Sequence, residues 1–195
     1  MMDGSELLRI LKETGAYLNG HFLLTSGLHS DAYVEKFRVL ERPEYTEAAC
    51  RELAGRFGDQ GVAVVVGPTM GGVILAYEVA RALGARAIFV EREGSGRTLR
   101  RGFSIAKGER TLVVEDVVTT GGSVREVIQV VQDAGGDLVG VGLLIDRSAG
   151  GADFGVRTES LLRLPLVTYR PEECPLCRDG IPLVRPGSVV RQHES

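Results

Sequence analysis

The sequence has few cysteines, no long apolar run and no excess of positive charge. Its three cysteines are too few for a disulfide framework, which favours the cytoplasm. No apolar stretch approaches the roughly 20 residues that span a bilayer, and the first ten residues lack the basic and apolar regions of a signal peptide. The net charge of −3 gives no footprint for nucleic acid. We therefore expect a cytoplasmic protein with no membrane or nucleic-acid partner.

The chain also lacks internal repeats, low-complexity segments and an interdomain linker. Its 195 residues fit one domain with a full core. The apolar content of 44% and the charged content of 25% are ordinary for a globular protein. We expect a single domain over residues 1–195.

Hydrophobic periodicity predicts alternating strands and helices. Strands are expected at 62–66, 86–90, 111–115 and 138–145, and helices at 5–14 (capped by Ser5), 43–57, 71–83 and 121–134. This alternation predicts an α/β fold with an open, mostly parallel sheet and helices on both faces. A strand near 20–24 and a second over 31–39 predict a hairpin, and 156–168 is expected to return as edge strands. The core would comprise about 43–147, and a small hood about 15–40 and 150–195.

The stretch TLVVEDVVTTGGS at 111–123 carries the clearest chemical pattern. A buried strand ends in two carboxylates, Glu115 and Asp116, and a turn of small and hydroxyl residues opens a helix. Backbone N–H groups at a helix N-terminus can surround a phosphate, helped by the helix dipole. Two carboxylates beside that turn can accept hydrogen bonds from vicinal sugar hydroxyls. The stretch predicts a ribose 5-phosphate site; the alternative is an ordinary strand–loop–helix with a solvated acidic pair.

Two further loops lie where ligands bind in open α/β sheets. The turn GPTMGG at 67–72 follows the strand at 62–66, and could contact a pyrophosphate or be only a tight turn that needs glycine. The segment 91–102 contains Gly94-Ser95-Gly96 and four arginines. It could be a solvated charge run, but its position favours a mobile lid that closes on a polyanion. Arg147, at the end of the strand over 138–145, could bind a substrate carboxylate or pair with Asp146.

These motifs resemble those of the type I phosphoribosyltransferases. VVEDVVTTGGS is similar to their PRPP-binding motif, which has four hydrophobic residues, two acids and a small, Thr- and Gly-rich turn. It is neither a Walker A sequence nor a Rossmann fingerprint. The resemblance runs from about residue 7 to 147. Within the family, the element F-x-L-x-S-G and the aromatic that follows it look most like the hood of the orotate phosphoribosyltransferases; the matching residues are Phe22, Leu24, Ser26, Gly27 and Tyr33.

The resemblance implies a transferase reaction in which orotate and PRPP give orotidine 5′-monophosphate and pyrophosphate, with Mg²⁺ bound mainly through PRPP. Glu115, Asp116 and Arg92 would be catalytic, and Thr119 and Arg147 would bind orotate. The residues implied in PRPP binding are Glu115, Asp116, Val117, Val118, Thr119, Thr120, Gly121, Gly122, Ser123, Arg92, Arg97, Thr69 and Gly71, with Arg100 as a further pyrophosphate contact. A homodimer that shares its lids is also implied.

Three departures from the family pattern stand out. The lid has arginines where the family usually has lysines and a histidine, Met70 and Gly71 replace an aromatic and a lysine, and Thr25 stands at a common lysine position. These departures leave room for a purine phosphoribosyltransferase acting on adenine or xanthine, or for a PRPP-sensing regulator without catalysis.

The histidines and the cysteine pair give a weak case for a metal. His21 and His29 show no carboxylate or cysteine partner for a metal, so surface or turn positions are expected. The CPLC element at 174–177 supplies only two ligands, and Cys50 or His193 could complete a site only through a coincidence of folding. We expect a structural or redox-inert tail rather than a zinc site.

Overall fold

The computed structural model describes residues 2–24, 26–94 and 96–186. The helices are α1 (Gly4–Glu13), α2 (Phe37–Leu40), α3 (Pro43–Gly55), α4 (Gly71–Leu83), α5 (Gly122–Asp133) and α6 (Pro175–Arg178), with a 3₁₀ turn η1 (Pro171–Glu173). The strands are β1 (Tyr17–Leu23), β2 (His29–Val34), β3 (Val64–Pro68), β4 (Arg86–Glu93), β5 (Gly96–Leu99), β6 (Arg110–Val118), β7 (Asp137–Asp146), β8 (Thr158–Arg163) and β9 (Thr168–Tyr169). Among these residues, no helix combines the length and apolar character needed to cross a membrane.

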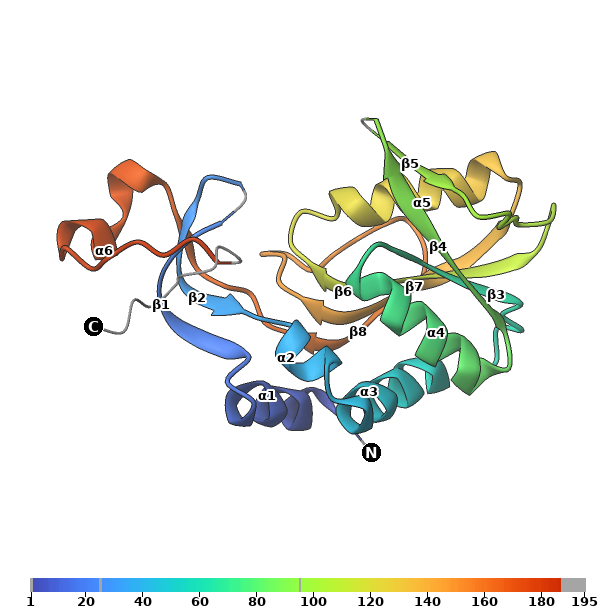
Figure 1. Cartoon of the computed structure of the whole chain (residues 1–195), viewed down its shortest axis with the longest axis horizontal. Coiled ribbons are helices and arrows are strands. Elements are labelled where there is room, and N and C mark those ends of the chain that lie inside the picture. The colour runs from blue at the N-terminus through green and yellow to red at the C-terminus, as the bar shows by residue number, and fades with distance from the viewer. Residues whose placement is uncertain (1, 25, 95, 187–195) are drawn as a thin grey trace.

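The strands form two sheets. The larger has the order β5-β4-β3-β6-β7-β8, and all of its pairs are parallel except the antiparallel pair of β4 and β5. The smaller is antiparallel, with the order β1-β2-β9, and forms the hood at one end of the molecule (Figure 1). The expected α/β architecture, a mostly parallel sheet with helices on both faces and a small hood, is confirmed.

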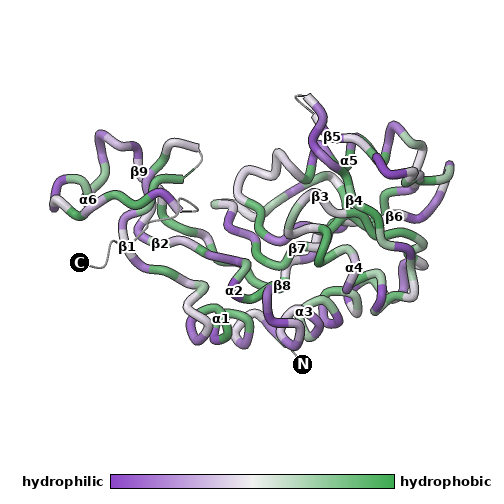
Figure 2. The backbone as a smooth tube through the Cα atoms, in the orientation of Figure 1, coloured by the Kyte–Doolittle hydropathy of each residue, from purple (hydrophilic) through white to green (hydrophobic). Residues whose placement is uncertain are grey.

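The core has one apolar layer on each face of the larger sheet. Leu112 and Val114 of β6 pack toward α3 and α4, while Val113 packs toward α5. All three are fully buried, which explains the continuous apolar run of this central parallel strand. Burying each such side chain contributes about 1.5–3 kcal/mol of transfer free energy. Figure 2 shows the apolar residues gathered along the central strands and hydrophilic residues along β5.

Three predicted details of the fold are wrong. The strand expected over 31–39 ends at Val34, and Phe37–Leu40 is helical because Leu40 N–H donates to the Lys36 carbonyl and Glu41 N–H to the Phe37 carbonyl. The α1 helix begins at Gly4 rather than after Ser5, because Asp3 Oδ1 accepts from the N–H groups of Ser5 and Glu6, each at 2.9 Å. Residues 158–163 belong to the larger sheet as the edge strand β8, not to the hood. The expectation of an edge strand there is confirmed.

Candidate active site

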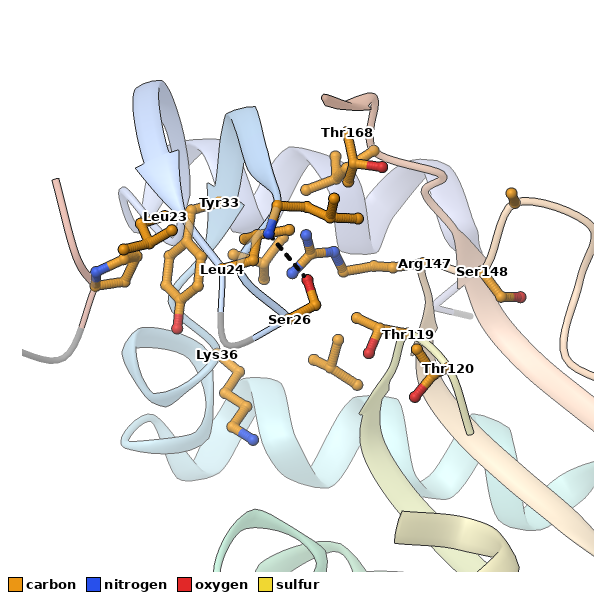
Figure 3. A pocket seen from close by; sticks show the side chains of 16 residues that line it. Leu23, Leu24, Ser26, Tyr33, Lys36, Thr119, Thr120, Arg147, Ser148 and Thr168 are labelled. Atoms are coloured by element: carbon orange, nitrogen blue, oxygen red, sulfur yellow. Dashed lines mark hydrogen bonds between the residues drawn. The ribbon is translucent and has the colours of Figure 1, made fainter. Parts of the chain in front are cut away.

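The site lies where the carboxyl ends of the parallel strands face the hood. Loops after β3, β6 and β7 meet at this edge of the sheet, as the sequence predicts for an open α/β fold. A cavity of about 410 Å³ separates this edge from the hood. Its polar lining includes Ser26, Tyr33, Lys36, Thr119, Thr120, Arg147, Ser148 and Thr168 (Figure 3).

The turn after β6 leads into the N-terminus of α5, which has no side-chain cap. Gly121 is the N-cap of α5 with φ of +79°, a left-handed conformation that favours glycine. A glycine cap has no side chain to accept hydrogen bonds from the first-turn N–H groups, so these donors are available to a ligand. Thr119 and Thr120 are exposed in the same turn. A second hollow of about 90 Å³ lies over this turn, between it and Phe154. The turn can therefore hold a phosphate.

The two carboxylates lie on opposite faces of β6. Asp116 points toward α4, where a Cβ placed on Gly71 would come within 1.6 Å of its Oδ2. Glu115 points toward α5 and Ser123. Both are buried, Asp116 with 1% and Glu115 with 7% exposure, and neither lines the larger cavity. The acidic pair is therefore buried, which contradicts the alternative interpretation of a solvated acidic pair.

Lys36 is a site residue that the sequence analysis missed. Its Nζ lies 2.8 Å from Oδ1 and 2.7 Å from Oδ2 of Asp116, and its side chain lines the cavity. The N–H of Val117 also donates to Asp116 Oδ1, at 2.6 Å. The pattern of residues 31–39 predicts a strand, and a lone lysine between Val34 and Phe37 gives no sign of a site in the sequence. The pairing gives the buried Asp116 carboxylate a positive partner.

Glu115 differs from Asp116 in its environment. Burial raises the pKa of Glu115, and the negative charge of Asp116 raises it further. Contacts with Ser123 and Lys36 oppose this change without cancelling it. Glu115 therefore holds a proton to higher pH than an ordinary glutamate, and can offer a sugar hydroxyl either an acceptor or a donor.

The glycine-rich turn after β3 is tight because backbone segments pack against each other. Neither Gly67, Gly71 nor Gly72 has a left-handed φ. Instead, a Cβ on Gly67 would lie 2.2 Å from the carbonyl oxygen of Gly72, and one on Gly72 would lie 2.6 Å from Pro68 Cδ. Gly71 also leaves the space that the Asp116 carboxylate fills. The turn thus brings Thr69 and Gly71 next to the acidic strand end.

The segment expected to be a lid is an antiparallel hairpin of β4 and β5, in which Arg92 faces Arg97. Arg97 is nearly buried and reaches α5, donating from Nε to Glu126 and from Nη2 to the Ser123 hydroxyl, each at 2.9 Å. Arg92 is more exposed, 3.6 Å from Glu126. The hairpin therefore brings Arg97 to Ser123 in the first turn of α5. The other arginines pair with acids on the hairpin: Arg100 with Glu93 and Arg101 with Glu91.

Arg147 projects into the cavity from the end of β7 (Figure 3). Its Nε is buried without a hydrogen-bond partner among the described residues. Burial lowers the pKa of Arg147, an effect that the nearby Tyr33 opposes. Asp146 does not pair with it, because Asp146 accepts from the Ser148 N–H and hydroxyl and from the Ala152 N–H. Arg147 is therefore placed to bind an anion rather than to form a structural pair.

The hood supplies the opposite wall. Leu24, Ser26 and Tyr33 line the cavity, as expected from the F-x-L-x-S-G element. Phe22 is buried behind them and supports Tyr33, with ring centroids 5.7 Å apart. Gly27 adopts φ of +82° in the turn between β1 and β2. Thr25 lies outside the described residues.

The predicted surface or turn positions of His21 and His29 are wrong. Both imidazoles are buried, with 2% and 5% exposure, and they lie beside Cys174 and Cys177 inside the hood. The two pairs are far apart in sequence, so their proximity could not be read from spacing. His193, considered as a partner in sequence, is outside the described residues.

Comparisons with known proteins agree with this geometry. The family model "Phosphoribosyl transferase domain" matches residues 40–153. The chain is 58% identical over 187 residues to an orotate phosphoribosyltransferase of Pelotomaculum thermopropionicum, covering 96% of this chain and 98% of that protein. It is 55% identical over 179 residues to one of Thermotoga maritima, covering 92% and 96%.

Solved structures show the same fold. The orotate phosphoribosyltransferase of Aeropyrum pernix matches with a TM-score of 0.70 and 31% identity, over 81% of this chain and 93% of that one. An adenine phosphoribosyltransferase of Rhodothermus marinus matches with a TM-score of 0.62 and 26% identity, over 82% and 99%. The fold is thus shared by proteins named for different bases, whereas the high sequence identities are to proteins named for orotate. The chain belongs to the type I phosphoribosyltransferase family, in its orotate phosphoribosyltransferase branch.

Proposed function

We propose that this chain is a pentosyltransferase that moves the ribose 5-phosphate of PRPP to orotate, releasing pyrophosphate and forming orotidine 5′-monophosphate for pyrimidine synthesis. The choice of orotate as the base rests on the position of Arg147. Arg147 is a half-buried arginine on the cavity wall, and its buried Nε has no hydrogen-bond partner among the described residues. Such a group favours an anionic partner, and a planar carboxylate matches the fork of its guanidinium. Orotate carries such a carboxylate, whereas adenine and xanthine do not.

In this proposal, PRPP binds at the carboxyl ends of the parallel strands. The 5′-phosphate would accept hydrogen bonds from the first-turn amides of α5 and from the hydroxyls of Thr119, Thr120 and Ser123. Val117 and Val118 lead the chain into this turn, and Gly121 and Gly122 let the backbone approach the phosphate. Thr119 also lines the cavity, where it would touch the base.

The carboxylates would act on the sugar. Glu115 and Asp116 would hold the 2′ and 3′ hydroxyls from the two sides of the strand end. As pyrophosphate leaves, C1 of the ribose gains positive charge, and nearby negative charge stabilises that transition state. The Asp116 carboxylate already accepts hydrogen bonds from Lys36 Nζ and from the Val117 N–H. The sugar hydroxyl would be its third donor.

The pyrophosphate would lie between the turn after β3 and the β4–β5 hairpin. Thr69 and Gly71 would contact it through the backbone, while Arg92 and Arg97 would balance its charge. Arg97 lies at the Ser123 hydroxyl, 2.9 Å from its Nη2, which supports this placement.

Mg²⁺ is consistent with this donor set only as an ion carried by the substrate. The described residues provide just two carboxylates here, one of them paired with Lys36, and no cluster of three acids. Mg²⁺ keeps waters and favours phosphate oxygens, so PRPP would supply most ligands. The ion would neutralise charge on the leaving group. We further propose a homodimer in the cytoplasm, testable by sedimentation and fractionation.

The test is pyrophosphate release from PRPP and Mg²⁺ with orotate, adenine or xanthine as acceptor. We expect turnover with orotate only, and a loss of at least about 100-fold in kcat/KM for Arg147→Ala, since a bidentate charged pair is removed. Arg51→Ala, on the outer face of α3 with 71% side-chain exposure, is the matched control and should be unchanged.

Full orotate turnover by Arg147→Ala would contradict the assignment of the carboxylate. Turnover with a purine instead of orotate would identify a purine enzyme. PRPP binding without pyrophosphate release from any base would identify a regulator.

A further inference from the structure

Four side chains with metal-binding atoms converge inside the hood, apart from the cavity. His21 comes from β1, His29 from β2, and Cys174 and Cys177 flank the start of α6. Their ligand atoms all lie within 4.8 Å of one another. Three of the four residues are buried, and Cys177 is exposed. None of them lines the larger cavity. We propose that these four residues bind one zinc ion, which fastens the C-terminal segment to the hood.

The spacing of the ligand atoms fits a tetrahedral centre. Zinc with bonds of about 2.3 Å to sulfur and about 2.0 Å to nitrogen places its sulfur and nitrogen ligands about 3.5 Å apart. Cys174 Sγ lies 3.5 Å from His21 Nε2, and Cys177 Sγ lies 3.7 Å from it. Cys177 Sγ lies 3.3 Å from His29 Nδ1. The imidazole nitrogens are 2.9 Å apart and would separate by a few tenths of an ångström, about 3.3 Å being ideal.

Hydrogen bonds alone satisfy this cluster poorly. His21 Nδ1 lies 2.8 Å from the carbonyl oxygen of Ile181, so in the neutral ring it donates there and leaves Nε2 with a lone pair. That one lone pair faces His29 Nδ1 and both cysteine sulfurs, and it can accept a proton from only one of these three neighbours at a time. A cation at the centre uses all four lone pairs instead. The Ile181 carbonyl then fixes the ring and its tautomer, as outer partners of metal-bound histidines do.

The hood has few buried apolar residues of its own. Of its described apolar residues outside the two core layers, Phe22, Ala32 and Cys174 are buried. Ile181, Leu183 and Val184 of the C-terminal segment are more than 40% exposed. Within the described residues, this segment adds to the hood sheet the two-residue β9 and a single bridge between Phe22 and Val184. Small units without a sufficient core are often stabilised by a structural metal.

The donor set selects the metal. Two thiolates and two imidazoles in a closed tetrahedron are typical of structural zinc sites, whereas Mg²⁺ and Ca²⁺ take oxygen ligands. With four protein ligands no position stays open for a substrate, so the ion would have a structural role. It would hold β1 and β2, whose connecting turn lines the cavity, without entering the reaction.

The first experiment measures metal in the full chain, purified without an affinity tag and dialysed against metal-free buffer. We expect about one zinc per chain by elemental analysis, and about a tenth or less in Cys177→Ser. Cys177 is chosen because its exposure favours folding of the variant. Cys50→Ser is the control; Cys50 is a buried cysteine of α3 outside the cluster, and this variant should keep its zinc.

The second experiment uses spectroscopy and stability, so the outcome does not depend on one variant. The chain produced with Co²⁺ should show the thiolate-to-cobalt absorption and strong visible bands of a tetrahedral site. A chelator should lower the Tm of the wild type by at least about 5 °C and leave Cys177→Ser unchanged.

A wild-type chain with less than about a tenth of a zinc and no cobalt spectrum would overturn the proposal. A Cys174–Cys177 disulfide detected by mass spectrometry in protein purified under reducing conditions would overturn it as well, as would stoichiometric iron or copper. These readouts are independent of pyrophosphate release, so the metal site and the proposed reaction can fail separately.

Discussion

Replacing Lys36 by methionine should destabilise the fold by removing the positive partner of a buried carboxylate. Lys36 Nζ lies within 2.8 Å of both Asp116 oxygens, and the Asp116 side chain is 2% exposed. Removing one member of a fully buried ion pair costs about 3–5 kcal/mol. The Lys36 side chain is 31% exposed, so water screens part of this interaction, and we expect a loss of about 2 kcal/mol.

A double-mutant cycle separates this interaction from the loss of packing. Asp116→Asn should cost less than Lys36→Met, because the lysine can reach water whereas the carboxylate cannot. In Lys36→Met/Asp116→Asn the two effects should not add, leaving a coupling energy of about 1–2 kcal/mol. Urea denaturation at pH 7 measures each variant, and Lys12→Met on α1 is the surface control. If Lys36→Met were no less stable than Lys12→Met, or if Asp116→Asn gave no rescue, the reasoning would be refuted.

Two further predictions concern the strand end and the turn after β3. The raised pKa of Glu115 means that the folded chain binds the extra proton, so its contribution to stability falls as pH rises above the ordinary value of 4.5 and through the folded pKa. Glu115→Gln should therefore gain at least about 1 kcal/mol over wild type at pH 8 but not at pH 4, by urea denaturation, while losing turnover. An equal gain at both pH values would contradict this. Gly67→Ala should lose about 3 kcal/mol or more by the same assay, since its Cβ would meet the Gly72 carbonyl. Gly55→Ala, in open space on α3, should be neutral or slightly stabilising, and equal behaviour of the two would argue against close packing of the turn.

The sequence predicted the parts of the fold that depend on local patterns. Apolar runs predicted the central parallel strands, and the small and hydroxyl residues after β6 predicted the turn that opens α5, at the same sheet edge as Arg147. Its role in phosphate binding stays a prediction. These signals are local because a buried parallel strand and a helix N-terminus each leave their pattern within about ten residues.

The missed features depend on contacts between distant segments. Phe37 and Val39 alternate as in a strand, but backbone hydrogen bonds from Lys36 onward make the segment helical and place Lys36 at Asp116. His21 and Cys174 are 153 positions apart, and only the folded hood brings them together. Periodicity carries no information about such pairings.

Because Glu115 and Asp116 lie on opposite faces of β6, the site depends on the register of this strand. Thr111 pairs with Val64 of β3 and with Leu138 of β7, and these ladders decide which acid faces which helix. A shift of β6 by one residue would exchange the faces of the two carboxylates. Asp116 would then lie on the α5 side of the sheet, away from Lys36. The hydrogen-bond register of three central strands therefore sets the distribution of charge around the proposed sugar site, and we expect strand mispairing to abolish turnover even in a chain that still packed.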